Sequence, residues 1–241
     1  MSRPFLLLSS RPEHDVARLE HRSVARLMGL APADVVQLRM ESAPLPPLDL
    51  DAYSGVLLGG SPFTFSDSDK TDLQQRVEAD AGLVLRQVLE RDLPFLGLCY
   101  GIGLVTDLLG GRVDRSFPEP VGATTVRLTD AGRADPLLHG TPASFAAYVG
   151  HKESCPAVPA GAVLLATSEP CPVQMYRYGE HGYVTQFHPE LDHAGLAARI
   201  RAYRHHGYFP ADEAEALVAD TAAADVSGAH VLLRRFAERY A

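Results

Sequence analysis

The stretch 94–103, PFLGLCYGIG, places one of only three cysteines between an apolar run and a glycine-rich segment. The run PFLGL predicts a buried strand, and the residues after Cys99 have the apolar pattern of a helix. A residue at the carboxyl end of a parallel strand lies at the sheet edge where open α/β folds bind ligands. We therefore expect Cys99 to lie at a binding site.

Short apolar runs and helical patterns alternate through the first half of the chain. Strands are predicted at 5–10, 35–40, 55–60 and 94–99, and helices at 13–30, 71–91 and 101–111. This alternation predicts an α/β fold whose mostly parallel, flavodoxin-like sheet is flanked by helices. Between 111 and 182 shorter strands joined by turns indicate a partly antiparallel region, and 182–187 returns to the main sheet.

No internal repeat or linker divides the chain, so we predict one domain at 1–206 with a helical C-terminal extension at 207–241. We expect the extension to pack on the same domain, and a dimer or partner interface is its alternative use. An apolar stripe runs along its last helix: Val231, Leu232, Leu233, Phe236 and Tyr240.

Composition excludes several classes of protein. The net charge of −8 over 241 residues argues against a nucleic-acid surface, which needs a basic footprint. No apolar run reaches the roughly 18 residues of a membrane span, and the short N-terminal run FLLL lacks a signal peptide's cleavage site. The three cysteines form no CxxC pair, which favours a cytoplasmic protein over a disulfide scaffold or zinc site.

The flanks of Cys99 resemble a nucleophile elbow. Gly97 and Gly101 lie two residues to either side, where a sharp strand-to-helix turn favours small residues. The helix that follows points its free N–H groups at the sulfur, which lowers a thiol pKa and can hold an oxyanion. The alternative is a buried structural cysteine.

A base and an oxyanion hole complete this hypothesis. His188 and Glu190, in QFHPEL, lie two residues apart at a strand end, so Glu190 can orient an imidazole that takes the thiol proton. The pair Gly59 and Gly60 ends the third strand, and the Gly60 N–H is a candidate oxyanion donor together with that of Tyr100. Taken alone, the glycine pair is better explained as a simple tight turn.

In this order, GG near 60, GLCYG near 99 and HPE near 190 resemble the class I glutamine amidotransferase family. Standalone proteins similar to the glutaminase domain of GMP synthase are the best match, and the resemblance covers about residues 5–205. The structural rival, an α/β-hydrolase, places its acid before its histidine, whereas here the histidine comes first.

The resemblance implies that Cys99 attacks a γ-glutamyl carbonyl, His188 protonates the leaving amine and Glu190 orients His188. It implies glutamine as the substrate and ammonia as a product delivered to a synthetase. The chain contains no GxxxxGK[ST] loop, so a synthetase partner would be a separate protein. No cofactor or metal is implied.

One position departs from the family pattern. The family's elbow continues C-x-G-x-Q, and that glutamine helps to bind the substrate, whereas this chain has Gly103. The opened space favours a larger γ-glutamyl compound or another residue in the same role. By the resemblance, the segment GHKES lines the substrate pocket, which makes Gly150, His151 and Lys152, together with Gly59 and Gly103, candidate substrate-binding residues; a solvated turn is the alternative.

Three functions therefore remain open. The first is a glutaminase that supplies ammonia to a partner, and the second is a standalone γ-glutamyl peptidase or hydrolase. The third is a non-catalytic relative that binds a ligand or an enzyme. Cys155 and Cys171, which each precede a proline, are expected to take no part in catalysis.

Overall fold

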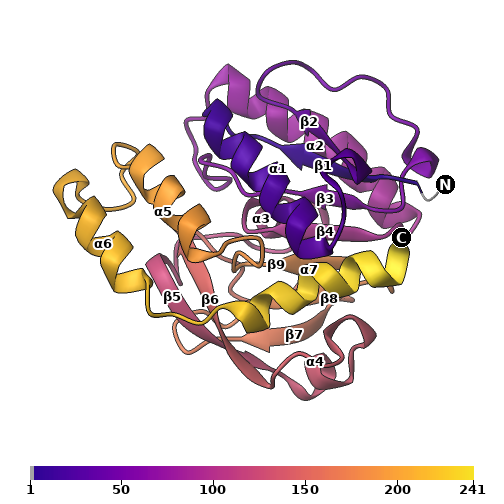
Figure 1. The fold of residues 1–241 in the computed structure, drawn as a ribbon. Coiled ribbons are helices and arrows are strands. Elements are labelled where there is room, and N and C mark those ends of the chain that lie inside the picture. The colour runs from indigo at the N-terminus through magenta and orange to yellow at the C-terminus, as the bar shows by residue number, and fades with distance from the viewer. Residues whose placement is uncertain (1–2) are drawn as a thin grey trace.

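The computed structural model describes residues 3–241, which form a nine-stranded sheet in the order β2-β1-β3-β4-β9-β8-β7-β5-β6 (Figure 1). The strands are β1 (Phe5–Ser9), β2 (Val35–Arg39), β3 (Val56–Leu58), β4 (Phe95–Leu98), β5 (Glu119–Leu128), β6 (Ser144–His151), β7 (Val163–Thr167), β8 (Met175–Tyr178) and β9 (Gly182–Thr185).

Half of this sheet is parallel, as the alternating pattern predicts. β1 pairs with β2 and β3, β3 with β4, and β4 with β9, all in parallel. The connecting helices are α1 (His14–Met28), α2 (Asp72–Glu90) and α3 (Tyr100–Leu108). Because the strands are buried on both faces, neighbours in sequence enter different cores: Leu7 faces α1, and Leu8 faces α2 and α3.

The other half is antiparallel. β8 pairs with β9, β7 with β8, and β5 with both β7 and β6, all antiparallel. This region corresponds to the shorter strands predicted between 111 and 182, and it includes the short helix α4 (Asp130–Ala134). The α/β fold is thus confirmed, and the sheet is mixed, with the parallel strands gathered on one side.

Helical periodicity gave the helices but misplaced some of their side chains. Leu19 of α1 and Leu83 of α2 fit the apolar patterns, yet they are 40% and 65% exposed. Glu20, next to Leu19, is only 2% exposed. A charged residue therefore occupies an inward position that a pattern of apolar residues cannot indicate.

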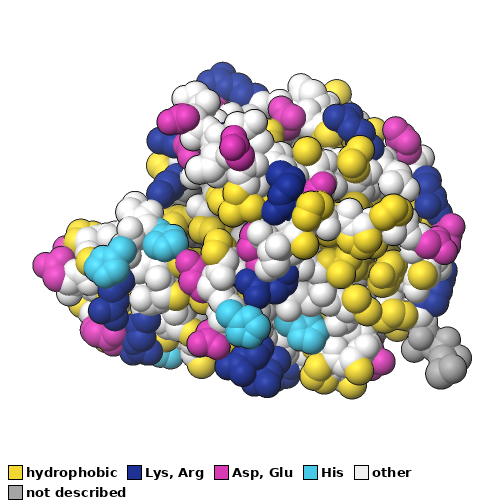
Figure 2. All heavy atoms as spheres, turned by 90° about the horizontal axis from the view of Figure 1, so that it is seen from above, with side chains coloured by type: hydrophobic (Ala, Val, Ile, Leu, Met, Phe, Trp, Pro, Cys, Tyr) yellow, Lys and Arg dark blue, Asp and Glu magenta, His cyan; other side chains and the backbone are white. Residues whose placement is uncertain are grey.

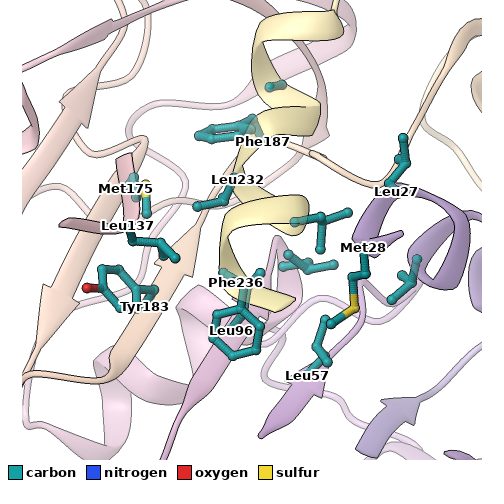
Figure 3. Close-up of a cluster of buried hydrophobic side chains, with 14 of the residues drawn as sticks. Leu27, Met28, Leu57, Leu96, Leu137, Met175, Tyr183, Phe187, Leu232 and Phe236 are labelled. Carbon is teal, nitrogen blue, oxygen red and sulfur yellow. The ribbon is translucent and has the colours of Figure 1, made fainter. Parts of the chain in front are cut away.

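Three helices follow the last strand: α5 (His193–Ala202), α6 (Ala214–Thr221) and α7 (Ser227–Tyr240). α7 lies across the sheet on the same side as α1 (Figure 1). Leu232 and Phe236 of α7 reach the same buried cluster as Leu57 and Leu96 (Figure 3). The stripe predicted on this segment is therefore largely buried within the chain, while the boundary at 206/207 stays a prediction.

The surface carries charges of both signs. On the face shown in Figure 2, basic side chains are scattered among acidic ones, so that face has no basic stripe. Among residues 3–241, no helix combines the length and the apolar character needed to cross a membrane. All three cysteines are free thiols.

Candidate active site

Cys99 occupies a strained turn between β4 and α3. Its backbone has φ 51° and ψ −85°, and Asp92 is the other non-glycine residue with positive φ in the described chain. The Cys99 N–H donates to the Thr185 carbonyl oxygen at 2.7 Å, which ties the elbow to β9. Such conformations cost about 1–3 kcal/mol and persist where surrounding structure fixes them. The partly exposed thiol is thus held at the carboxyl edge of the sheet.

The two elbow glycines differ in what they allow. A Cβ on Gly97 would lie 3.0 Å from Val184 Cγ1 and 3.1 Å from the Phe95 ring, so glycine is needed there. A Cβ on Gly101 would meet its nearest neighbours, atoms of Leu58, at an ordinary 3.6 Å. We expected both positions to require a small residue, and the contacts show this requirement for Gly97 but not for Gly101.

His188 and Glu190 form a buried pair beside Cys99. His188 Nδ1 lies 2.8 Å from Glu190 Oε1, and the His188 N–H donates to the Tyr148 carbonyl oxygen at 2.8 Å. Glu190 is fully buried and His188 is 8% exposed. The structure therefore brings together the three side chains that the sequence singled out as nucleophile, base and orienting acid.

The charges of this pair support each other. Burial alone would lower the pKa of His188, but the Glu190 carboxylate and Cys99 together raise it to about 9. Burial opposes ionisation of Glu190 too, yet His188 and Arg199 hold the pKa of that carboxyl well below its usual range. The two groups thus favour each other's charged forms, a protonated His188 next to an ionised Glu190.

Two residues with candidate oxyanion donors, Gly60 and Tyr100, lie next to Cys99. Among the described residues, neither the Gly60 N–H nor the Tyr100 N–H donates to another group of the protein. Tyr100 is the first residue of α3. The N–H groups in the first turn of a helix donate no bond to the helix's own carbonyl groups, so the Tyr100 N–H is free to bind another acceptor. A Cβ on Gly60 would fall 3.7 Å from Cys99 Cβ, so this loop lies directly beside the nucleophile.

A pocket opens in front of Cys99. Among the residues that line it are Cys99, His188, Phe63, Ile102, Leu196 and Phe209. The wall opposite the triad is largely apolar, and part of it comes from α5 and the segment that follows α5.

Comparison with known proteins gives this arrangement a family. The model of the family described as "Glutamine amidotransferase class-I" matches residues 20–203. The chain belongs to this family. At 21% identity and a TM-score of 0.79, a glutamine amidotransferase from Thermotoga maritima has a similar fold over 100% of this chain and 99% of its own. A glutamine amido transferase from Methylobacillus flagellatus has 19% identity and a TM-score of 0.73, with 100% and 96% covered.

Curated relatives of this class I amidotransferase domain are much longer proteins. GMP synthase [glutamine-hydrolyzing] from Thermosipho melanesiensis is 32% identical over 124 residues, which are 51% of this chain and 23% of that protein. The Streptomyces coelicolor protein of the same name is 32% identical over 118 residues, or 48% and 22%. The match therefore covers less than a quarter of either synthase.

The predicted substrate-binding residues of this amidotransferase fold divide into two groups. Gly103, Gly150, His151 and Lys152 all line the pocket. Gly59 does not, because the space that its side chain would take holds the Glu20 carboxylate, 2.8 Å from the built Cβ. The structure thus gives Gly59 a different use, which is to make room for a buried charge.

The segment 150–154 is fixed by its own hydrogen bonds. The Glu153 carboxylate accepts from the backbone N–H groups of Phe65 and Ser66 at 2.7 and 2.6 Å. The Phe65 Cβ would lie 3.5 Å from a Cβ on Gly103, so Phe65 borders the space that the family's glutamine would enter. Lys152 Nζ lies 4.4 Å from the centroid of the Tyr208 ring and donates to the His206 carbonyl oxygen at 3.3 Å.

Sequence reasoning missed several polar residues near the thiol. Gln186 Nε2 lies 3.9 Å from Cys99 Sγ, and its place two residues before His188 in QFHPE was an available signal. Arg11, Glu20 and Arg199 lie behind the histidine and come from distant parts of the chain. No local pattern marks them, because only the fold brings them together.

A second buried group combines the same residue types. Glu119, His151 and Cys171 each place one potential metal-ligand atom within 4.8 Å of the others. One oxygen of the group is already engaged: His151 Nε2 lies 2.8 Å from Glu119 Oε2, which also accepts from Gln174 Nε2 at 2.5 Å, whereas Glu119 Oε1 is buried without a partner among the described residues. Burial raises the pKa of the Cys171 thiol to about 12, which opposes the thiolate that a metal would require.

Proposed function

We propose that this protein is a cysteine-dependent amidohydrolase that cleaves the γ-amide of glutamine through a γ-glutamyl thioester. One observation carries the proposal. The Cys99 thiol sits on a strained elbow at the floor of a pocket, beside a buried His188–Glu190 pair. A structural cysteine would need neither the strain nor the access.

In the first half of the proposed reaction, the Cys99 thiolate attacks the γ-carbonyl carbon and forms a C–S bond. The developing oxyanion accepts hydrogen bonds from the N–H groups of Gly60 and Tyr100. His188 then gives its proton to the amide nitrogen, the C–N bond breaks and ammonia leaves. Glu190 stabilises the imidazolium before this transfer and keeps the ring in position.

In the second half, water hydrolyses the thioester. Neutral His188 accepts a proton from the water as its oxygen attacks the carbonyl carbon, and the C–S bond then breaks. Glutamate leaves, and Cys99 and His188 return to the thiolate–imidazolium pair. This chemistry requires no cofactor or metal.

We assign the amino-acid end of the substrate to the wall formed by 150–154. In this proposal Lys152 pairs with the substrate carboxylate, and Gly150 and Gly103 let the substrate approach the backbone. His151 holds the wall in place, because its ring is bonded to Glu119 and to the Glu153 carbonyl oxygen.

We propose that the released ammonia is used by a separate synthetase in the cytoplasm. The curated relatives are GMP synthases whose names state that they hydrolyse glutamine, and this chain matches less than a quarter of each. A synthetase subunit would then receive the ammonia that this chain releases.

A specific observation favours a second candidate, a standalone γ-glutamyl peptidase or hydrolase. Gly103 borders the pocket without a side chain, and many of the residues that line this pocket are apolar. A γ-glutamyl amide with a larger amine would fill such a pocket better than glutamine does.

The test is release of glutamate and ammonia or amine by the purified protein, with Cys99→Ala as the control. The panel holds glutamine and a set of γ-glutamyl peptides and amides. Cys99-dependent turnover of glutamine supports the ammonia-supplying enzyme, and turnover of the other compounds alone supports the standalone hydrolase. If no compound is turned over and the Cys99 thiol is no more reactive than the other two, the protein is a non-catalytic binder and the proposal is wrong.

A further inference from the structure

Behind His188 lies a chain of buried charged side chains that the proposed reaction does not use. Arg199 NH2 lies 2.8 Å from Glu190 Oε1 and 3.2 Å from Glu20 Oε1. Glu20 Oε1 in turn lies 2.6 Å from Arg11 Nε. Arg11 and Glu20 are 2% exposed and Arg199 is 8% exposed. Starting from His188, the charges alternate in sign along the whole chain.

Such a chain is expensive to bury and needs an explanation. Ion pairs without solvent often contribute nothing to stability relative to apolar packing, so stability alone does not account for this one. Its outer members have further partners: Ser9 Oγ donates to Glu20 at 2.9 Å, and Arg11 NH1 donates to Tyr203 Oη at 3.0 Å, whereas Glu190 Oε2 has no partner among the described residues. The residues come from α1, from α5 and from the loop after β1, and they converge on the histidine.

Arg199 is the member that touches the pair. Its NH1 lies 3.1 Å from His188 Nδ1, and its NH2 shares Glu190 Oε1 with that same nitrogen. Because Glu190 is ionised, Nδ1 donates its proton to Oε1, and the Arg199 cation therefore faces another donor. Arg199 thus takes part of the Glu190 charge away from His188 and fixes the carboxylate's direction.

The far end of the chain supports the loop that holds the proposed oxyanion donor. A Cβ on Gly59 would lie 2.8 Å from Glu20 Oε2, and a Cβ on Gly60 would lie 2.7 Å from Arg11 NH2. Both glycines therefore pack directly on this network. The same four charges link the acid of the triad to the loop opposite the nucleophile.

We propose that Arg199, held in place by Glu20 and Arg11, is a positioning residue that sets the pH range over which His188 keeps its proton. The proposal rests on the proposed function of Cys99 and His188 as a reactive pair. The charged and titratable groups next to His188 are those of Cys99, Glu190 and Arg199. Arg11, Tyr203 and Tyr208 line the same pocket as His188, and Glu20 contacts both arginines.

The experiment follows alkylation of Cys99 by iodoacetamide as a function of pH, which requires no substrate. Peptide mapping separates Cys99 from the other cysteines, and circular dichroism checks that each variant is folded. The alkaline step of the profile reports the loss of the His188 proton.

Arg199→Gln removes the cation and leaves the full Glu190 charge acting on His188. The alkaline step should move upward by about one pH unit. Arg199→Lys, which keeps the charge, should restore the parent profile. Arg201→Gln, two residues along α5, loses an exposed pair with Glu215 and should leave the profile unchanged.

Glu20→Gln should move the alkaline step downward, because Arg199 then draws more strongly on Glu190. Shifts of opposite sign cannot result from a general loosening of the site. If Arg199→Gln and Glu20→Gln are folded and keep the pH profile of the parent protein, the proposal is wrong. It is also wrong if neither variant folds, because the two charges would then serve the fold and not His188. If the shifts appear while no γ-glutamyl amide is turned over, the proposed function fails and this inference stands.

Discussion

The molecule contains two groups made of a cysteine, a histidine and a glutamate, and they differ in nearly everything except composition. Cys99 and His188 line a pocket, with Glu190 buried against His188, whereas Cys171, Glu119 and His151 meet in the antiparallel half of the molecule and only His151 reaches that pocket. The imidazole–carboxylate distance is 2.8 Å in both. Residue types and this one distance therefore do not distinguish a reactive site from a structural one.

Backbone and access make the difference. Cys99 sits on a strained elbow, partly exposed, with an unused N–H next to it, whereas Cys171 is fully buried. The Glu190 pair is flanked by the cation of Arg199, whereas Glu119 Oε2 accepts from the neutral amide of Gln174. In our proposal the parallel strand ends supply the reactive group, and the antiparallel half supplies a wall of the pocket.

Replacing each of the two cysteines by alanine should give the largest difference in turnover. Cys99→Ala should lower turnover of the best γ-glutamyl substrate by about four orders of magnitude or more, because the covalent route is lost. Cys171→Ala should leave turnover within a few-fold, since its thiol contacts no substrate. Steady-state release of glutamate measures both. Equal losses in the two variants would remove the distinction between the groups.

The two glutamates should separate catalysis from stability. Glu190→Gln should lower kcat by roughly 10²–10⁴-fold, because the imidazolium loses its counter-charge. Glu119→Gln should leave kcat nearly unchanged and destabilise the fold by about 1–3 kcal/mol, because the new amide group places an N–H donor where Glu119 Oε1 has no partner in a buried site. Initial rates measure the predicted changes in kcat, and urea unfolding curves measure the predicted change in stability. A kcat loss in Glu119→Gln that matches Glu190→Gln would contradict this division of roles.

The pH dependence of unfolding gives a smaller effect. The folded-state pKa of His188 is about 9, above the ordinary value near 6.5, so its stabilising contribution is complete below pH 6.5 and is lost as the pH rises through 9. The contribution is about 3 kcal/mol. His188→Gln should flatten this part of the stability curve, while the exposed control His205→Gln should not. An unchanged slope in His188→Gln would contradict the buried imidazolium.

The elbow glycines give the smallest expected effect. Gly101→Ala should be tolerated and should stabilise the protein by roughly 0.5–1 kcal/mol, because glycine is a poor helix former and the site has room. Gly97→Ala should destabilise it through contacts with Val184 and Phe95. Thermal unfolding of both variants measures these changes in stability. A lower Tm for Gly101→Ala would show that the turn itself requires glycine there.

The sequence predicted the parallel half of the fold, and it singled out three side chains that the structure brings together. Buried parallel strands are continuously apolar, and GLCYG and HPE are compact local motifs at strand ends. A candidate site built on strand ends can therefore be located from local sequence motifs, while its catalytic role stays a prediction.

The network behind the histidine could not be predicted in the same way. In α1 the apolar pattern favours Leu19 as the inward residue, yet Glu20 is buried because it finds Arg11 and Arg199. Those partners lie 9 and 179 residues away in the sequence. The available hint was the pair Gly59 and Gly60, whose missing side chains leave room for that charge.

The most direct test of the central claim uses a γ-glutamyl analogue that carries a diazomethyl ketone in place of the amide. Such a compound alkylates only a nucleophile that sits where the γ-carbonyl binds. The account predicts one label per chain, on Cys99, with protection by excess γ-glutamyl substrate and no label in His188→Gln at the same exposure. No label, or label spread equally over Cys99, Cys155 and Cys171, would contradict it.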